Sequence, residues 1–326
     1  MEITFIRQLV DQARSEPRLI VLPEGRDERV LRAAAEATSR GVATCLFLDD
    51  IATLERECRD HDIDLNDNMR PFDVGPYMEA FVKRLVVLRE KKGLSETQAR
   101  SMLSNPQIVA TMMVEQGEAD GLVSGAATVT ADVLRPALQL VGKHEDEALV
   151  SSFFFMCFED GPKLFADCAL NTNPDADALA AIGQQSAVTA QRFGLDPKVA
   201  LLSYSTDASG SGTSVNMVKA ATEKLKALDP SLKVEGPIQY DAAVNPRIAA
   251  SKLPKSNVAG QANVLIFPDL DAGNIAYKAV QQAAGIISVG PIIQGLNRPI
   301  NDVSRGATTD DILYTIVTTV IQARGL

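Results

Sequence analysis

Hydroxyl, glycine and arginine residues gather in four short segments whose composition suits the binding of an anion. The first segment, 205–213, reads STDASGSGT and lies between an apolar run and a helical pattern. Its glycines let backbone N–H groups approach an anion closely, and its hydroxyls add donors. It lacks the Gly-Lys-Ser/Thr ending of a nucleotide P-loop and the G-x-G-x-x-G fingerprint. A phosphate or acyl-phosphate cradle is favoured over a flexible surface loop, with these candidate contacts: Ser205, Thr206, Ser209, Gly210 and Gly212.

The second segment, 124–130, reads SGAATVT and follows another short apolar run. Ser124 and Gly125 end the expected strand, and Thr130 is predicted to be the N-cap of the next helix. A helix N-terminus attracts anions, so these three residues are candidate substrate-binding residues. Arg135 follows inside the same helix, where its side chain points either into the same pocket or into solvent.

The third segment, 268–274, reads PDLDAGN. Asp269 and Asp271 could hold a metal ion, but the favoured interpretation is the capped start of a helix.

The fourth segment, 295–311, places Arg298, Ser304 and Arg305 before a strongly apolar helical pattern. Guanidinium groups match the geometry of phosphate, so both arginines are candidate anion-binding residues. Thr308 and Asp311 fit the S/T-x-x-D/E capping pattern. On spacing alone, helix capping is therefore the favoured role of Asp311.

Apolar runs and helical patterns alternate along most of the chain, which is typical of parallel sheets wrapped by helices. Such sheets bind ligands beyond the carboxyl ends of their strands, where the four segments lie. Residues 148–170 are expected to form a hairpin that marks the transition into a second domain. The last helix, 310–322, is expected to pack back on the first domain. We predict an α/β protein whose first domain comprises residues 1–147 and 297–326 and whose second domain comprises residues 148–296.

Composition excludes several functional classes. The 326 residues carry a formal charge of −10, which disfavours nucleic-acid binding, because that affinity depends on neutralising phosphates. The four cysteines form no C-x-x-C pair and are expected to be buried free thiols. His61 and His144 stand in charged runs, so neither a zinc site nor a histidine-based triad is expected. No apolar run is long enough to span a membrane and no signal peptide is visible, so we expect a cytoplasmic protein with no membrane contact.

Long stretches of the sequence resemble the phosphate acyltransferases, the phosphate acetyl/butyryltransferase family. The matching stretches run from about residue 20 to the C-terminus: LPEGRDERVLRAA, DGLVSGAATVTADVLRPALQL, ALLSYSTDASGSGTSVNMVKAAT, GPIQYDAAV, NVLIFPDLDAGNIAYKAVQ and GPIIQGLNRPINDVSRGATTDDI. The resemblance implies two α/β/α domains with mainly parallel sheets, related to the isocitrate and isopropylmalate dehydrogenase fold. It also implies a site in the cleft between the domains, and a homodimer.

The reaction implied by the resemblance is reversible transfer of an acetyl group between acetyl phosphate and coenzyme A, giving acetyl-CoA and inorganic phosphate. Coenzyme A is then a substrate, and no permanently bound cofactor or metal is expected. The family motif makes Asp311 the base for the thiol, places Ser304 at the reacting centre and gives the phosphate to Arg305. Two upstream arginines of the family, implicated in binding coenzyme A or substrate, match Arg89 and Arg135.

Two residues depart from the family pattern. Thr128 stands where many relatives have a histidine, so any role of that histidine is absent here. Asp207 adds negative charge to the first segment, close to a proposed anion site.

Three alternatives remain beside acetyl transfer. The first is a preference for longer acyl chains, as in a phosphate butyryltransferase, because the sequence does not indicate the size of the acyl pocket. A non-catalytic acetyl-CoA-sensing module is disfavoured by the retention of Ser304, Arg305 and Asp311. A dehydrogenase of the same fold would need metal-binding aspartates and a Lys–Tyr pair that we cannot assemble. Because no cysteine lies in the four segments, direct attack by the thiolate is favoured over an acyl-enzyme.

Overall fold

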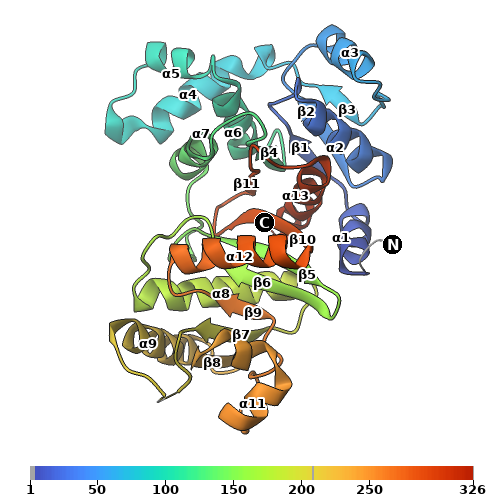
Figure 1. Ribbon diagram of the computed structural model, residues 1–326. Coiled ribbons are helices and arrows are strands. Elements are labelled where there is room, and N and C mark those ends of the chain that lie inside the picture. The colour runs from blue at the N-terminus through green and yellow to red at the C-terminus, as the bar shows by residue number, and fades with distance from the viewer. Residues whose placement is uncertain (1–3, 208, 326) are drawn as a thin grey trace. The chain divides into compact units, whose positions relative to one another are not determined.

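The computed structural model describes residues 4–207 and 209–325, which divide into two compact units (Figure 1). Unit 1 comprises Met1–His144 and Leu296–Leu326, and unit 2 comprises Glu145–Gly295. Each unit has one sheet with helices on both faces. This arrangement confirms the predicted α/β class with mainly parallel sheets.

The sheet of unit 1 has five parallel strands in the order β11-β4-β1-β2-β3. Their bounds are β1 (Arg18–Val21), β2 (Ala43–Phe47), β3 (Met69–Pro71), β4 (Gly121–Ser124) and β11 (Ile300–Asp302). From β1 the chain adds β2 and β3 on one side, and then β4 and β11 on the other. The strand order therefore reverses between β1 and β4, where α/β sheets form their binding crevice.

Helices cover both faces of this sheet. On one face lie α1 (Thr4–Arg14), α2 (Glu28–Ser39) and α13 (Thr309–Gln322), with α3 (Ile51–Asp60) beside α2 and β3. Helices α6 (Pro106–Gln116) and α7 (Thr130–Pro136) pack against β4 and β11 from the other side, and α4 (Met78–Leu88) and α5 (Glu96–Met102) pack beyond them. Single turns complete the unit at η1 (Gly75–Tyr77), η2 (Glu90–Lys92), η3 (Ala137–Val141) and η4 (Ala323–Gly325).

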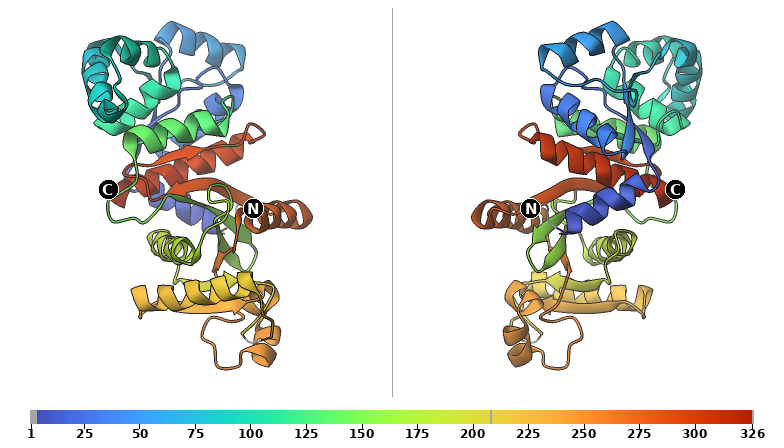
Figure 2. Two further views of the ribbon diagram at one scale, coloured as in Figure 1. Left: turned by 90° about the vertical axis from the view of Figure 1, so that its left-hand side faces the viewer. Right: turned by 90° about the vertical axis from the view of Figure 1, so that its right-hand side faces the viewer.

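Helix α13 is the most buried helix of unit 1. All of its residues from Ile312 to Gln322 are buried, because it lies between α1, α2 and four strands of the sheet. Figure 2 shows the red α13 alongside the blue α1 and α2. The predicted return of the last helix to the first part of the chain is thus observed. Thr315, Thr318 and Thr319 tolerate burial because each hydroxyl donates to a carbonyl one turn earlier.

The sheet of unit 2 has six strands in the order β10-β5-β6-β9-β7-β8. The expected hairpin is present as β5 (Ser151–Phe158) and β6 (Gly161–Ala166), joined by a turn at residues 159–160. Strand β5 is antiparallel to β6 and β10, and the remaining neighbours are parallel. The other strands are β7 (Lys198–Leu202), β8 (Lys233–Ile238), β9 (Val264–Ile266) and β10 (Ile287–Gln294).

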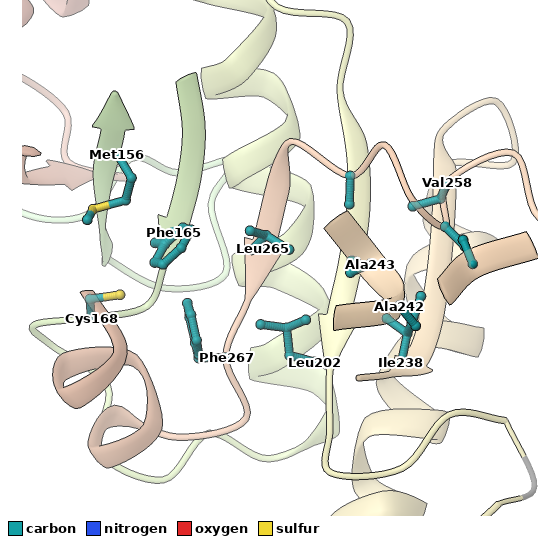
Figure 3. Close-up of a cluster of buried hydrophobic side chains, with 14 of the residues drawn as sticks. Met156, Phe165, Cys168, Leu202, Ile238, Ala242, Ala243, Val258, Leu265 and Phe267 are labelled. Atoms are coloured by element: carbon teal, nitrogen blue, oxygen red, sulfur yellow. The ribbon is translucent and has the colours of Figure 1, made fainter. Parts of the chain in front are cut away.

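Helices α8 (Ala176–Arg192) and α9 (Thr213–Leu228) cover one face of the unit 2 sheet, and α10 (Tyr240–Val244), α11 (Pro246–Lys252) and α12 (Leu270–Ala284) cover the other. A hydrophobic cluster fills the second interface (Figure 3). Phe165 of β6, Leu265 of β9 and Phe267, just after β9, belong to this cluster, as do Ala242 and Ala243 of α10. The small alanines allow this short helix to approach the sheet closely.

Two expectations about ordinary roles are confirmed. Asp269 caps α12 and accepts a hydrogen bond from the Ala272 N–H at 2.8 Å. All four cysteines are free and buried.

No cluster of three or more potential metal ligands occurs within residues 4–207 and 209–325. Across the same residues, no helix is both long and apolar enough to cross a bilayer.

The burial of α13 predicts a large effect of truncation. Ile316 is 0% exposed, so Ile316→Ala should lower the free energy of unfolding by about 2–5 kcal/mol, through lost transfer energy and a cavity. Urea unfolding measures this. The matched control Ile51→Ala, at a side chain that is 47% exposed, should change stability by less than about 0.5 kcal/mol. Equal losses in the two variants would contradict the assigned packing.

Candidate functional site

The loops after β1, β4 and β11 meet at the carboxyl edge of the unit 1 sheet. A pocket of about 440 Å³ opens there between the loops after β1, β2 and β4. Its lining is formed by Pro23, Glu24, Gly25, Arg26, Asp27, Leu48, Asp49, Pro106 and Ala127. Because this pocket lies beside the reversal of strand order, it occupies the position where α/β sheets bind ligands.

Glu24 occupies the backbone donors of the second predicted segment. Its carboxylate accepts hydrogen bonds from the N–H groups of Gly125, Ala126 and Ala127, each at 2.9 Å. Three converging amides form the kind of concavity that binds an external anion. Here the chain's own carboxylate accepts from all three amides, including that of the candidate Gly125.

Two further candidates of the second segment have roles inside the protein. The Ser124 hydroxyl is buried and donates to Gln107 Oε1 at 2.8 Å. Thr130 is the first residue of α7 and not its N-cap, which is Val129 without a side-chain capping bond. The predicted cap is therefore wrong. The Thr130 side chain instead lies near Asp302, at the end of the neighbouring strand, and lowers the pKa of that carboxyl.

Arg29, at the start of α2, ties the three loops together. Its guanidinium donates to the carbonyl oxygens of Ala126 (2.8 Å), Arg305 (2.8 Å) and Ala307 (2.9 Å). The Asp27 carboxylate, which also caps α2, holds the guanidinium from the other side at 2.7–3.0 Å. These charge-assisted bonds lower the pKa of Asp27 and raise that of Arg29. One ion pair thus fixes the loop backbone at Arg305 and Ala307.

The loop after β11 presents Ser304 and Arg305 to solvent. Val303 N donates to Ser124 O at 2.7 Å, and Ser304 Oγ accepts from Gly306 N at 3.2 Å, so the backbone is ordered while both side chains stay exposed. Asp311 lies one turn further on and forms the expected capping box with Thr308. Its Oδ2 accepts from the Thr308 N–H and hydroxyl, both at 2.8 Å. The capping role predicted from spacing is confirmed.

Asp302 is a buried acid beneath this loop. It is 3% exposed, and no hydrogen bond reaches its Oδ1 among the described residues. Burial raises its pKa to about 6, the Glu24 charge adds to the rise, and the Thr130 hydrogen bond opposes it. The backbone of Gly125, at φ +115°, passes so close that an added Cβ would lie 2.4 Å from Oδ1.

Three candidate arginines lie apart from the loop cluster. Arg89 is half-buried at the C-terminal end of α4. The Arg135 side chain is 63% exposed, with a loose ion pair to Asp132 at 3.8 Å. The guanidinium of Arg135 is therefore accessible to solvent in this structure. Arg298 precedes β11 and lies near Gly117, at the amino edge of the sheet, opposite to Ser304.

The first predicted segment lies at the carboxyl end of β7 in unit 2, and Ala208 within it lies outside the described residues. Ser205 Oγ and Ser209 Oγ are 3.1 Å apart, and the Ser209 hydroxyl accepts from Thr206 N at 3.0 Å. The Thr206 hydroxyl donates to Gln239 Oε1 at 3.2 Å. These bonds order the loop, and Gly210 and Gly212 lead into α9.

Sequence reasoning missed Glu24, Arg29 and Asp302. Glu24 stands directly after the first apolar run, which is a detectable signal once the strand order is known. Arg29 looks like an ordinary residue of an amphipathic helix, and its partner Arg305 is 276 residues away. The family motif indicates Ser304 and Arg305, and nothing in the local sequence indicates that Asp302 is buried.

The fold and its carboxyl-edge loops define a doubly wound α/β protein with two α/β/α units. A family model, phosphate acetyl/butaryl transferase, matches residues 4–320. A phosphate acetyltransferase from Haemophilus influenzae is 47% identical over 319 residues, covering 98% of this chain and 45% of that protein. The chain belongs to the phosphate acetyl/butaryl transferase family, which confirms the resemblance seen in the sequence.

Solved structures agree with this assignment. A phosphotransacetylase from Streptococcus pyogenes matches with a TM-score of 0.90 and 39% identity over 100% of both chains. EutD phosphotransacetylase from Staphylococcus aureus matches with a TM-score of 0.89 and 38% identity over 98% of both chains. The chain spans about half the length of the curated relatives it matches.

Asp302 should make stability depend on pH. Because its folded pKa of about 6 exceeds the ordinary 3.8, the native state binds the proton more tightly than the unfolded chain. This contribution is complete below pH 4 and is lost as pH rises through 6. Asp302→Asn should therefore gain about 3 kcal/mol relative to wild type between pH 4 and pH 7.5. Urea unfolding across this range measures the gain.

The matched control for this series is Asp67→Asn, at an exposed aspartate of the same unit. Its stability relative to wild type should stay within about 0.5 kcal/mol at every pH. A pH-independent difference for Asp302→Asn would show that Asp302 is already ionised at low pH.

Proposed function

We propose that this chain catalyses reversible acetyl transfer between acetyl phosphate and coenzyme A, forming acetyl-CoA and inorganic phosphate. The observation that carries the proposal is the loop after β11. In this loop Ser304 and Arg305 are exposed to solvent, and Arg29 donates hydrogen bonds to two carbonyl oxygens of its backbone. Membership of the phosphate acetyl/butaryl transferase family and the names of the aligned relatives support this reading.

In the proposed site, Arg305 binds the phosphoryl group and Ser304 donates a hydrogen bond at the reacting centre. A guanidinium neutralises charge on the phosphate as it becomes the leaving group, without proton transfer. The Arg29 carbonyl bonds fix the loop before substrate arrives, so less ordering energy is lost on binding. Ser205, Thr206, Ser209, Gly210 and Gly212 remain proposed ligand contacts of unit 2, and Arg89 and Arg135 remain proposed contacts of coenzyme A.

Asp311 is the proposed base for the thiol, but its contribution is modest. Its Oδ2 already accepts two hydrogen bonds from Thr308, which compete with an incoming proton. A thiol of pKa near 8.5 is a few per cent ionised at pH 7, so full ionisation is worth only about 2 kcal/mol. Positioning both substrates and neutralising the phosphate supply the larger share.

Direct attack of the thiolate on acetyl phosphate is proposed in place of an acyl-enzyme. Burial raises the pKa of all four cysteine thiols, and that of Cys45 and Cys157 reaches about 12. A thiol is a weak nucleophile, so these side chains are poor acyl acceptors. The attack therefore occurs in a ternary complex of the two substrates.

The remaining parts of the proposal rest on the family resemblance. The proposed enzyme is a cytoplasmic homodimer without a permanently bound cofactor. Acetyl is the proposed acyl group, because the last loop agrees most closely with the acetyl-transferring relatives. Butyryl is longer than acetyl by two methylenes, each of which changes discrimination by only about 1–3 kcal/mol, so activity on butyryl phosphate is one alternative.

Purified protein with acetyl phosphate and coenzyme A, without added metal, should form thioester rapidly and reversibly, as monitored by ultraviolet absorbance. Arg305→Ala should lower kcat/KM by about 10²–10³-fold, because it removes the phosphate-binding charge. The matched control Arg56→Ala, on the exposed surface of α3, should keep wild-type activity. Acetyl-CoA binding without turnover would favour a sensing module.

Asp311→Asn should lower kcat/KM by less than about 30-fold, which is the limit set by thiol ionisation. The loss should therefore be smaller than that of Arg305→Ala, and the same steady-state assay measures both. Asn retains an oxygen for Thr308, so capping is largely preserved. The reverse ordering of the two variants would show that proton transfer dominates the barrier.

A further inference from the structure

Two carboxylates lie on either side of the Gly125 backbone. Glu24 Oε2 accepts from the Gly125 N–H at 2.9 Å. Asp302 Oδ1 lies so close to the Cα that only glycine fits there, since a Cβ would approach it to 2.4 Å. Asp302 is 3% exposed and its Oδ1 has no hydrogen-bond partner among the described residues. The arrangement places one carboxylate on each side of the same backbone, and of the two Asp302 is the buried one.

The groups around Asp302 provide little compensating charge. The loop after β1 contributes Glu24, whose negative charge repels that of an ionised Asp302, and α7 contributes the neutral Thr130 hydroxyl. Strand β4 contributes backbone at Ser124 and Gly125. Arg29, the cation of this cluster, is bonded to Asp27 and to three carbonyl oxygens. Burial, and to a lesser extent the negative charge of Glu24, therefore oppose ionisation of Asp302.

The two carboxylates differ in their hydrogen bonds. The Glu24 carboxylate accepts from three backbone N–H groups. Asp302 Oδ1 has no hydrogen-bond partner among the described residues, and burial raises the pKa of this carboxyl to about 6. Asp302 therefore carries a proton at mildly acidic pH.

Asp302 is joined directly to the proposed phosphate loop. It ends β11 two residues before Ser304, and the intervening Val303 N–H is fixed to Ser124 O at 2.7 Å. A charge change at Asp302 therefore acts on an ordered loop whose Ser304 is only two residues away.

We propose that Asp302 is a proton-bearing positioning residue of this site, and that loss of its proton to solvent weakens binding of the phosphoryl anion at Ser304 and Arg305. The inference rests on the proposed function of that loop and deepens it. The protonated carboxyl is neutral and leaves the Arg305 charge unopposed. The ionised carboxylate adds a negative charge below the loop, beside that of Glu24.

The test compares the KM for acetyl phosphate of wild type and Asp302→Asn from pH 5 to pH 8. Asparagine keeps the shape of the protonated acid but cannot ionise. Ionisation of the substrate and of coenzyme A is common to both proteins and cancels in the ratio of their KM values. We expect the ratio of wild type to variant to rise about tenfold across pH 6, with the kcat ratio nearly constant.

Two further variants make the test specific. Asp310→Asn removes an exposed carboxylate of the same segment and should change the KM by one constant factor at every pH. Glu24→Gln removes the neighbouring negative charge, so the midpoint of the KM change should move to lower pH. A flat ratio for Asp302→Asn, or an unmoved midpoint in Glu24→Gln, overturns the proposal.

Equilibrium binding of inorganic phosphate separates this inference from the proposed function. If the wild-type protein makes no acetyl-CoA, calorimetric titration with phosphate still compares wild type and Asp302→Asn at pH 5 and pH 8. A pH-dependent affinity ratio between the proteins supports the role of Asp302 without catalysis. A constant ratio, or no binding at either pH, overturns it.

Discussion

The carboxyl edge of the unit 1 sheet depends on one charge-assisted network. Glu24 takes up three backbone N–H groups of the loop after β4, and Arg29 takes up the carbonyls of that loop and of the loop after β11. Donors and acceptors left without partners at such an edge would each cost free energy comparable to a lost hydrogen bond. Glu24, in the loop after β1, accepts hydrogen bonds from the donors, and Arg29 of α2 donates to the acceptors. The network thereby orders loop backbone that belongs to no helix or strand.

In this network, the carboxylate of Glu24 and the proposed external anion occupy different loops. A loop rich in small residues after a parallel strand is usually interpreted as a phosphate site, and the loop after β4 has that composition. Its amides bind Glu24 instead, and the proposed site for an external anion lies on the neighbouring loop with Ser304 and Arg305. Glu24 and Asp302 concentrate negative charge beneath that loop. Burial raises the pKa of Asp302 to about 6, so protonation reduces this charge at mildly acidic pH.

The proposed chemistry needs little from the protein beyond this arrangement. An acyl phosphate is already activated, and a thiol is partly ionised at neutral pH. Rigid placement and charge neutralisation are then the useful contributions, and they are what an ordered loop with an exposed arginine provides. Asp311 combines an observed structural role, as a capping residue, with the proposed role of base. The capping box that begins α13 also fixes the carboxylate near the loop.

The sequence by itself determined the class of fold, the family and the order of the elements. Alternating apolar and helical patterns report on local burial, which is why β1, the β5–β6 hairpin, the buried α13 and the capping residues Asp269 and Thr308 were predictable. Long family motifs identified Ser304, Arg305 and Asp311 as candidates.

Only the tertiary structure decided what lies next to them. The strand order that puts β4 between β1 and β11 brings Glu24 to Gly125 and Arg29 to Arg305, across separations of 101 and 276 residues. It also places Arg298 at the opposite edge of the sheet and buries Asp302. Desolvation, and with it the protonation of Asp302, is a property of surroundings assembled from distant segments, so no local pattern encodes it.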